Sequence, residues 1–477
     1  MNSRARFPEL DLLRFIAACG VMLFHYTYLA PQHHLLPGSF PILSQIGKYG
    51  FLGVDVFFIL SGFVILLTAY EKDAIAFAVA RMLRLYPAYW ICVTLTAAAI
   101  VVTRSLPATV TPFQYFANLT MVHGFFGIRD VSGVYWTLAV EIQFYFLIFL
   151  ILLIGQIRRL GYLLGLWLLA SVILSLQEPR GIIRFFLFPE WSSYFIAGAM
   201  LFLIHREGPS LYKLFVVGAC YVLSTAYAIN LLPFGAGHLE ADFSAPVIVS
   251  ALAISYATFL FIAIRPRSGK KMASALLPLP NGEDRSEGAG ERVAGHGVLP
   301  LPKGEGRGEG EGTVLQPNVH QPARRTLQPT SRVLTDLIKL LGLITYPLYL
   351  LHQDIGYILF RSAPAGVNRL LLLVAVMFAM IALACLVHIG PEKWLVSRLK
   401  SLLSGPLSVA NSLKLVISQR FAGVDLKPAI PDRLVPTLIP IEVSSVPSAA
   451  QPTQPATADS HNTGLSTAPN PISPSTV

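Results

Sequence analysis

Ten runs of roughly 20 mostly apolar residues recur along this chain, and they constrain its fold more than any other feature. A helix of that length crosses the ~30 Å hydrocarbon core of a bilayer. The strict alternation of apolar and polar residues that is typical of a transmembrane β-barrel does not recur. The sequence therefore predicts an all-α, polytopic integral membrane protein, with about ten transmembrane helices at residues 10–30, 51–70, 85–103, 133–155, 160–176, 188–204, 211–232, 245–264, 337–360 and 369–389.

Composition supports this assignment. Of the 477 residues, 54% are hydrophobic and 13% are charged, and the mean hydropathy is +0.60. A soluble globular protein of this length would be far more polar.

Lysine and arginine gather in alternate loops between the predicted spans. Short cytoplasmic loops hold the excess of positive charge in multi-pass proteins. Arg4 and Arg6 precede the first span, and Arg81 and Arg84 lie between the second and third, so both termini are predicted to be cytoplasmic. The formal net charge of +10 then reflects orientation and contact with anionic membrane lipids, and no nucleic-acid partner is expected.

A segment rich in proline, glycine and charge interrupts the membrane core. It contains the near-repeat LPLPNGEDRSEG at 277–288 and LPLPKGEGRGEG at 299–310, and such a composition cannot bury enough apolar surface to order itself. We expect a disordered cytoplasmic insertion. The predicted organisation is a transmembrane core at 1–264 and 336–390, the insertion at 265–335, a candidate amphipathic cytoplasmic segment at 391–427 and a disordered tail at 428–477.

Two ionisable residues lie in the first predicted span, LDLLRFIAACGVMLFHYTYLA at 10–30. An ionisable side chain inside a bilayer is costly, so it usually faces protein or a water-filled path. Arg14 and His25 are eleven residues apart. At about 100° per residue, their directions around the helix axis differ by only about 20°, so both lie on one helix face. Along the axis they are roughly 16 Å apart. The alternative interpretation is structural: Arg14 pairs with Asp11, and His25 is a hydrogen-bonded histidine of the core.

Three other titratable residues are expected near the depth of His25. Glu141 lies about eight residues from the outer end of the fourth span, Asp55 opens the second span, and His352 lies in the outer half of the ninth. A histidine that a carboxylate orients can remove a proton from a hydroxyl as that hydroxyl attacks an acyl carbonyl. The sequence leaves open whether Glu141 or Asp55 is the partner of His25.

Three arginines are expected together at the cytoplasmic end, namely Arg14, Arg81 and Arg84. Guanidinium groups bind phosphates through bidentate, charge-assisted hydrogen bonds. The arrangement therefore suits a phosphate-bearing acyl carrier that enters from the cytoplasm and reaches towards His25.

Five ordered motifs carry a resemblance to a known family: RFIAACGVMLFHY, GVDVFFILSGFVI, RMLRLYPAYW, VYWTLAVEIQFY and ITYPLYLLHQ. They resemble the membrane-bound acyltransferase 3 family, whose members commonly O-acetylate cell-envelope carbohydrates, over residues 7–264 and 336–390. The resemblance implies an acyltransferase of the bacterial inner membrane. It would move an acyl group, acetyl above all, from cytoplasmic acyl-coenzyme A to a hydroxyl of a cell-surface or lipid-linked carbohydrate. No metal is expected. It also implies that Arg14 and His25 are the essential pair of the first span and that Arg81 and Arg84 form the family's basic motif.

Two alternatives come from other functional classes. A transporter or flippase for a lipid-linked sugar would also need ionisable residues along a path, although no second half resembles the first. A degenerate, non-catalytic copy is the other alternative, because the insertion departs from the family pattern.

Several further residues allow two interpretations. Trp136 is either an aromatic anchor at the outer interface or a border of the acceptor site. Asn118-Leu-Thr has glycosylation spacing, and Ser61-Gly62 indicates close helix packing by small residues. Residues 112–126 are expected to form a short external or re-entrant piece. No disulfide or metal site is expected from the cysteines, Cys19, Cys92, Cys220 and Cys385, which all fall inside predicted spans.

The orientation can be tested through residues 266–335. Single cysteines introduced there are predicted to react with a membrane-impermeant maleimide only from the cytoplasmic side, that is, in inverted vesicles and not in intact cells. Labelling in intact cells would contradict the ten-span topology.

Overall fold

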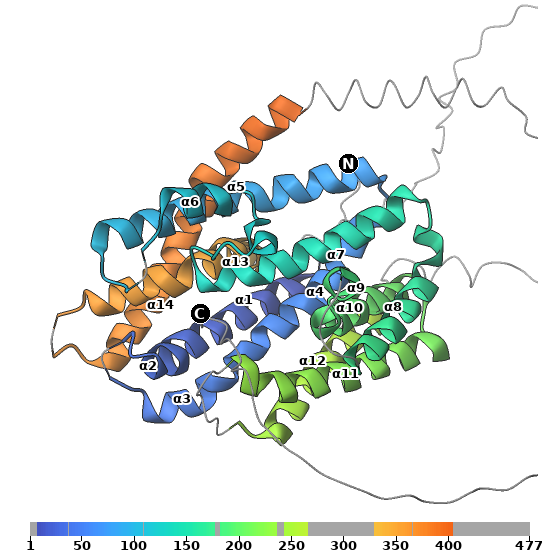
Figure 1. Ribbon diagram of the computed structural model, residues 1–477, viewed down its shortest axis with the longest axis horizontal. Coiled ribbons are helices and arrows are strands. Elements are labelled where there is room, and N and C mark those ends of the chain that lie inside the picture. The colour runs from blue at the N-terminus through green and yellow to red at the C-terminus, as the bar shows by residue number, and fades with distance from the viewer. Residues whose placement is uncertain are drawn as a thin grey trace, which may run out of the picture.

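The protein is a bundle of helices, most of which run roughly parallel to one another (Figure 1). This computed structural model describes residues 7–36, 38–107, 109–176, 182–235, 243–265, 329–364 and 366–403. The predictions made for most of the insertion and for the C-terminal tail lie outside these residues.

The predicted fold class and number of spans are confirmed. The described ranges contain no β-strand, and ten helical stretches in them are long and apolar enough to cross a membrane. They are Pro8–Gln32, Pro41–Ala69, Ala74–Thr103, Gly133–Leu153, Ile157–Ser175, Ile182–Glu207, Leu211–Ile229, Ala245–Ile264, Val333–Arg361 and Arg369–Leu403.

The first span changes its helix type at the level of His25. The α-helix α1 (Pro8–Leu23) continues as a six-residue π-helix η1 (Phe24–Leu29) and a last turn α2 (Ala30–Gln32). π-Helical turns are rare in proteins, and those that occur frequently lie at functional sites. His25 is the second residue of η1 and is buried.

The third span begins before its apolar run. Asp73 caps the N-terminus of α5 (Ala74–Thr103) by accepting a hydrogen bond from the backbone N–H of Ala76. Arg81 and Arg84, which the sequence placed in a loop, are therefore held on a helix. Hydropathy marks only the apolar part of a helix, whereas the cap determines where the helix begins.

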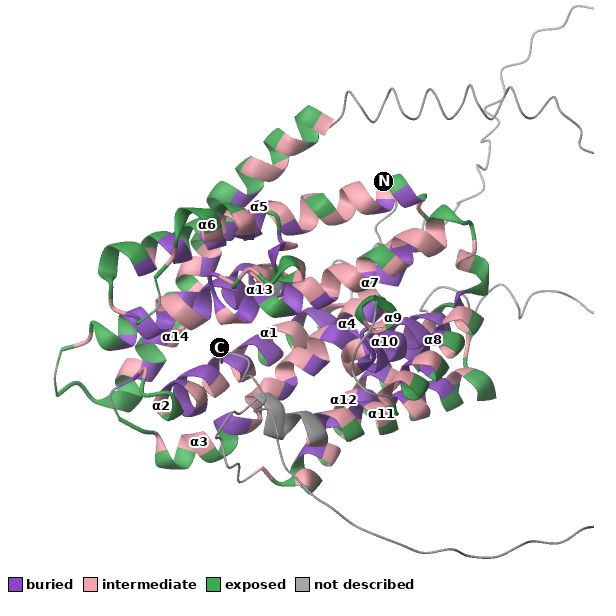
Figure 2. Cartoon of the chain, viewed as in Figure 1, coloured by how far each residue is buried: buried purple, intermediate pink, exposed green. Residues whose placement is uncertain are grey.

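The buried side chains form two hydrophobic clusters that meet at α1 and α4 (Figure 2). One cluster joins α4 (Leu52–Ala69), α7 (Trp136–Leu153), α8 (Leu160–Ser175), α10 (Pro189–Glu207), α11 (Leu211–Gly235) and α12 (Ala245–Ile264). The other joins α1, α5, α13 (Pro329–Arg361) and α14 (Arg369–Val387). The remaining helices are short: α3 (Pro41–Gly47), η2 (Lys48–Phe51), α6 (Pro112–Asn118), η3 (His123–Phe126), η4 (Gly133–Tyr135), η5 (Ile157–Arg159), α9 (Ile182–Leu187) and η6 (His388–Glu392).

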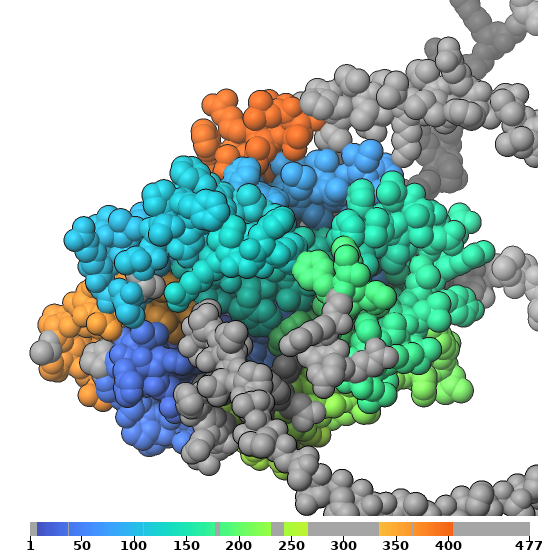
Figure 3. Space-filling view, viewed as in Figure 1, coloured from blue at the N-terminus to red at the C-terminus, as the bar shows by residue number. Residues whose placement is uncertain are grey.

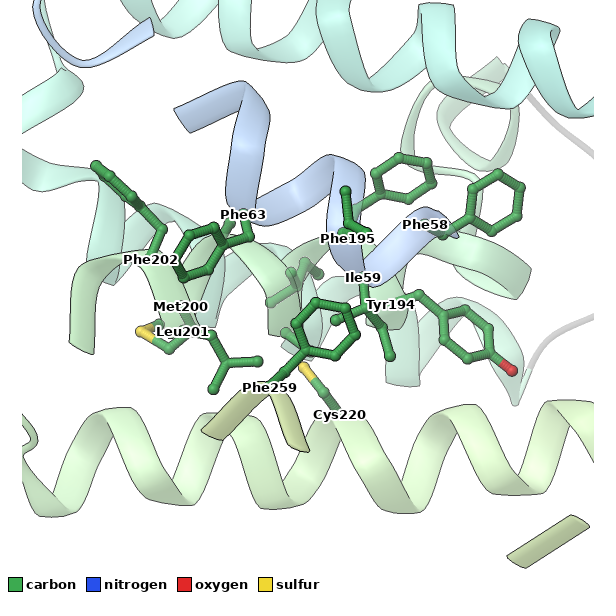
Figure 4. Close-up of a cluster of buried hydrophobic side chains, with 14 of the residues drawn as sticks. Phe58, Ile59, Phe63, Tyr194, Phe195, Met200, Leu201, Phe202, Cys220 and Phe259 are labelled. Atoms are coloured by element: carbon green, nitrogen blue, oxygen red, sulfur yellow. The ribbon is translucent and has the colours of Figure 1, made fainter. Parts of the chain in front are cut away.

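Helix α10 is the most buried helix of the first cluster and packs tightly on α4 (Figure 4). Gly62 and Gly198 allow this, since a Cβ at either position would overlap the backbone of the other helix. Beside this crossing the ring of Phe195 stacks on Phe58 at 4.8 Å and on Phe144 at 4.7 Å between centroids. The α4–α10 pair thus forms a rigid wall from which α4 presents its other face to α1 and α7.

The segment between α5 and η4 contains α6 and η3, so residues 112–126 form the short piece expected. Asn118 has no exposed surface, and its amide donates to the carbonyls of Gln114 and Arg129 and accepts from the N–H of Val131. The glycosylation spacing of Asn118 is therefore structural, because a buried amide with all these partners cannot accept a glycan. In Figure 3 residues of α5 to α7, light blue to teal, cover the centre of the visible face.

Candidate active site

Two cavities lie inside the bundle and adjoin at Val54 of α4 and Tyr349 of α13, the residues that line both. We call the smaller one, of about 140 Å³, the arginine chamber, because Arg14, Arg81 and Arg84 line it. We call the larger one, of about 830 Å³, the histidine chamber, because His25 lines it. The two ends of the Arg14–His25 face of the first span thus open into different cavities.

The arginine chamber brings together residues from α1, α5, α7 and α13. Arg81 and Arg84 lie on one face of α5 because they are three residues apart. Arg14 pairs with Asp11 at 3.1 Å, and Arg84, Asp11 and Glu141 are the charged groups close enough to act on it. The interpretation that pairs Arg14 with Asp11 thus describes a contact that exists, but the same guanidinium also lines the cavity.

Aromatic rings and one hydroxyl hold the other two guanidinium groups. Arg81 donates to the hydroxyl of Thr68 at 2.8 Å and lies 5.7 Å from the ring centroid of Phe77. Arg84 lies 5.9 Å from the ring of Tyr346. Neither arginine forms an ion pair within the described part of the chain. Both charges are therefore available to an anion.

Glu141 lies in the arginine chamber, which corrects the expectation that it shares the depth of His25. Its Oε1 accepts from the hydroxyl of Ser61 at 3.0 Å and from that of Tyr145 at 2.7 Å. The neighbouring Trp136 already lines the histidine chamber, so Glu141, more than one turn further along α7, lies below it. Ser61 accordingly has a hydrogen-bonding role besides the packing role of Gly62.

In the histidine chamber a tyrosine, and not a carboxylate, contacts the ring of His25. Nδ1 of His25 lies 3.1 Å from the hydroxyl of Tyr357, and no hydrogen bond joins His25 to Asp55 among the described residues. Asp55 lines the same cavity with its Oδ2 buried and without a hydrogen-bond partner. The carboxylate partner expected for His25 is thus replaced by a phenol.

His352 packs behind His25 and lines neither cavity. It is completely buried, its ring centroid lies 5.1 Å from that of His25, and its Nδ1 lies 2.8 Å from the carbonyl of Tyr349. The structure therefore brings His25, His352 and Asp55 to one end of the bundle and Glu141 with the three arginines to the adjoining chamber.

Residues 7–279 match a sequence family described as an acyltransferase domain, acyltransferase 3, over more than half of the chain. The chain belongs to the acyltransferase 3 family. The match covers α1 to α12 and leaves α13 outside, although α13 supplies part of the wall of both chambers.

Curated relatives of the chain include O-acetyltransferases. The chain is 32% identical to nodulation protein 10 of Rhizobium leguminosarum bv. viciae over 36% of its own length and 53% of that protein. It is 28% identical to the peptidoglycan O-acetyltransferase OatA of Listeria monocytogenes over 38% of its own length and 30% of the relative. It is 27% identical to the O-acetyltransferase OatA of Staphylococcus aureus over 37% of its own length and 30% of that relative. The chain thus spans about half the length of the first relative and about a third of the others, and no solved structure matches it.

The structure adds residues that the sequence did not single out. Tyr357 contacts His25 across 332 positions of sequence, and no local pattern marks it among 18 tyrosines. Gln353 and Asp354 also line the histidine chamber, and the polar run His-Gln-Asp inside an apolar span could have identified them. Trp136 lines this chamber too, with its ring centroid 5.0 Å from that of Trp191.

The charge balance of the arginine chamber generates a prediction. Glu141→Gln removes the carboxylate that lies among the three arginines, so we expect a loss of about 1–3 kcal/mol in the free energy of unfolding. Pyrophosphate should then raise the melting temperature of Glu141→Gln in detergent more than that of the unsubstituted protein, because an anion replaces the missing charge.

The matched control is Glu207→Gln, which breaks a surface ion pair with Lys213. It should shift the melting temperature little and respond to pyrophosphate as the unsubstituted protein does. If pyrophosphate raises the melting temperature of Glu141→Gln only as much as that of the unsubstituted protein, the proposed electrostatics of the chamber are contradicted.

Proposed function

We propose that this protein is an O-acyltransferase of the bacterial inner membrane that moves an acetyl group from cytoplasmic acyl-coenzyme A to a hydroxyl of a cell-envelope carbohydrate. One observation carries the proposal: a chamber with three arginines adjoins a larger chamber with a histidine. The first suits a phosphate-bearing donor, and the second suits a hydroxyl-bearing acceptor.

The donor would use the length of the first span. Arg14, Arg81 and Arg84 bind the phosphates of coenzyme A at the arginine chamber, whose volume is about 140 Å³. The arm then extends towards Val54 and Tyr349, and its thioester meets the acceptor there. The separation of roughly 16 Å between Arg14 and His25 suits an extended carrier arm between phosphates and thioester.

His25 would act as general base. The hydroxyl of Tyr357 also donates to the backbone carbonyl of His25, at 3.5 Å, so its oxygen can accept the proton of Nδ1. Nε2 then carries the lone pair, and no hydrogen bond of the described residues involves it. Tyr357 is thus a positioning residue that fixes the tautomer of His25.

The transfer step balances without another reagent. Nε2 of His25 takes the proton of the acceptor hydroxyl as its oxygen bonds to the thioester carbonyl carbon. The carbon–sulfur bond breaks, the acceptor becomes an ester, and the thiolate of coenzyme A leaves. His25 returns the proton to that thiolate, which yields the free thiol and restores the base.

The rival proposal is a transporter for a lipid-linked sugar, because a cavity of about 830 Å³ could also pass a sugar. Reconstituted liposomes separate the two, with labelled acetyl-coenzyme A inside and soluble peptidoglycan fragments outside. Label on the outer fragments supports the enzyme. Movement of fragments without label supports the transporter, and neither event supports a non-catalytic copy.

Variants of the first span sharpen this assay. Arg14→Lys keeps the charge but loses the planar fork, so we expect a raised KM for the donor with part of kcat retained. His25→Ala should bind the donor nearly normally and lose transfer by a factor on the order of 10².

Matched controls are Arg265→Lys, at an exposed arginine that pairs with Glu9, and His34→Asn, at an exposed loop histidine. Both should transfer normally. Near-normal transfer by folded His25→Ala would contradict the role of the base, and unchanged donor affinity of Arg14→Ala would contradict that of the phosphate clamp.

A further inference from the structure

Unpaired polar atoms lie together in the wall of the histidine chamber. Oδ2 of Asp354 and Oε1 of Gln353, two residues that line the chamber, are buried and have no hydrogen-bond partner. The same holds for Oγ of Ser132, which does not line the chamber itself but precedes the lining residue Gly133. Buried polar atoms are almost always paired, because an unpaired one costs free energy. Three such atoms in one region indicate a place where a bound molecule supplies the missing partners.

These atoms belong to a prepared part of the wall. Gln353 and Asp354 share one face of α13 with Tyr357, at spacings of four and three residues. Opposite them, Gly133 of η4 leaves room for Gln353, since a Cβ there would lie 3.1 Å from both polar atoms of the Gln353 amide. Because Tyr357 contacts His25, the group lies next to the base.

The chemistry of the group selects its ligand. Asp354 offers a carboxylate and Gln353 an amide oxygen, so both accept hydrogen bonds. Three aspartates, Asp55, Asp130 and Asp354, and one arginine, Arg129, line the cavity, so a phosphate would meet more acidic than basic groups. A molecule with several hydroxyl groups satisfies the acceptors without this repulsion.

The same chamber also offers an apolar surface. Trp136 and Trp191 line it with their ring centroids 5.0 Å apart. Aromatic walls with a few placed polar groups are typical of small-molecule sites. Sugars combine an apolar ring face with hydroxyl groups, and they therefore match both parts of the wall.

We propose that Asp354 and Gln353, with Ser132, form a subsite that binds a second hydroxyl of a polyhydroxylated acceptor while His25 takes the proton of the first. This inference rests on the proposed acyl transfer and adds to it the residues that recognise the acceptor. Such a subsite makes acceptors with neighbouring hydroxyl groups better substrates than simple alcohols.

The test uses the full-length protein and a matched pair of acceptors. Glycerol and propan-1-ol share a three-carbon skeleton, and only glycerol carries neighbouring hydroxyl groups. Both are offered at equal concentration with labelled acetyl-coenzyme A, and the two esters are counted. The unsubstituted protein should favour glycerol by roughly tenfold or more, as expected for hydrogen bonds to a charged group.

Asp354→Asn and Gln353→Leu should each lower this preference by roughly fivefold. The control Asp336→Asn changes an exposed aspartate of the same helix, paired with Lys339, and should keep the preference. If Asp354→Asn does not fold, Gln353→Leu carries the test.

The outcomes separate this inference from the proposed function. Equal use of both alcohols by the unsubstituted protein, or an unchanged preference in both folded variants, overturns the subsite alone. If the unsubstituted protein forms no ester and releases no coenzyme A, the proposed transfer fails together with the subsite.

Discussion

The hydrocarbon core of a membrane supplies no hydrogen-bond partner, so ionisable side chains within the spans depend on partners inside the protein or on molecules bound in its cavities. Here that constraint sorts the buried polar residues into two groups. Arg14, Arg81, Arg84 and Glu141 surround the arginine chamber, where ions, hydroxyls and aromatic rings stabilise one another. His25 and Asp354 belong to the other group, which faces the histidine chamber. The first span links the two because Arg14 and His25 share one face of it.

Helix α13 completes both chambers although it follows the region of the family match. It supplies Tyr346 and Tyr349 to the arginine chamber, and Gln353, Asp354 and Tyr357 to the histidine chamber. Gly342 brings α13 close to α1, because a Cβ there would overlap the side chain of Asp11. The proposed activity thus requires the chain on both sides of residues 266–328.

The sequence predicted features that depend on local pattern. Hydropathy located the ten spans, and helical periodicity placed Arg14 and His25 on one face, because both depend on neighbours along the chain. Contacts between distant helices were not predictable in this way. Glu141 proved to belong with the arginines and Tyr357 with His25, since these placements depend on how helices far apart in the sequence pack together. The hydropathy pattern also missed the first turns of α5, which begin at the cap residue Asp73. These turns place Arg81 and Arg84 on the helix.

The central claim is that a donor held by the arginines reaches the residues shared by the two chambers. Bromoacetyl-coenzyme A can measure this on a variant whose cysteines, Cys19, Cys92, Cys220 and Cys385, are replaced and whose Val54 is changed to cysteine. We predict alkylation at position 54 that excess coenzyme A blocks and that Arg84→Gln slows, whereas a cysteine at the exposed Ile16 of α1 shows neither effect. Absence of alkylation at position 54, or alkylation indifferent to both coenzyme A and Arg84→Gln, would contradict the account.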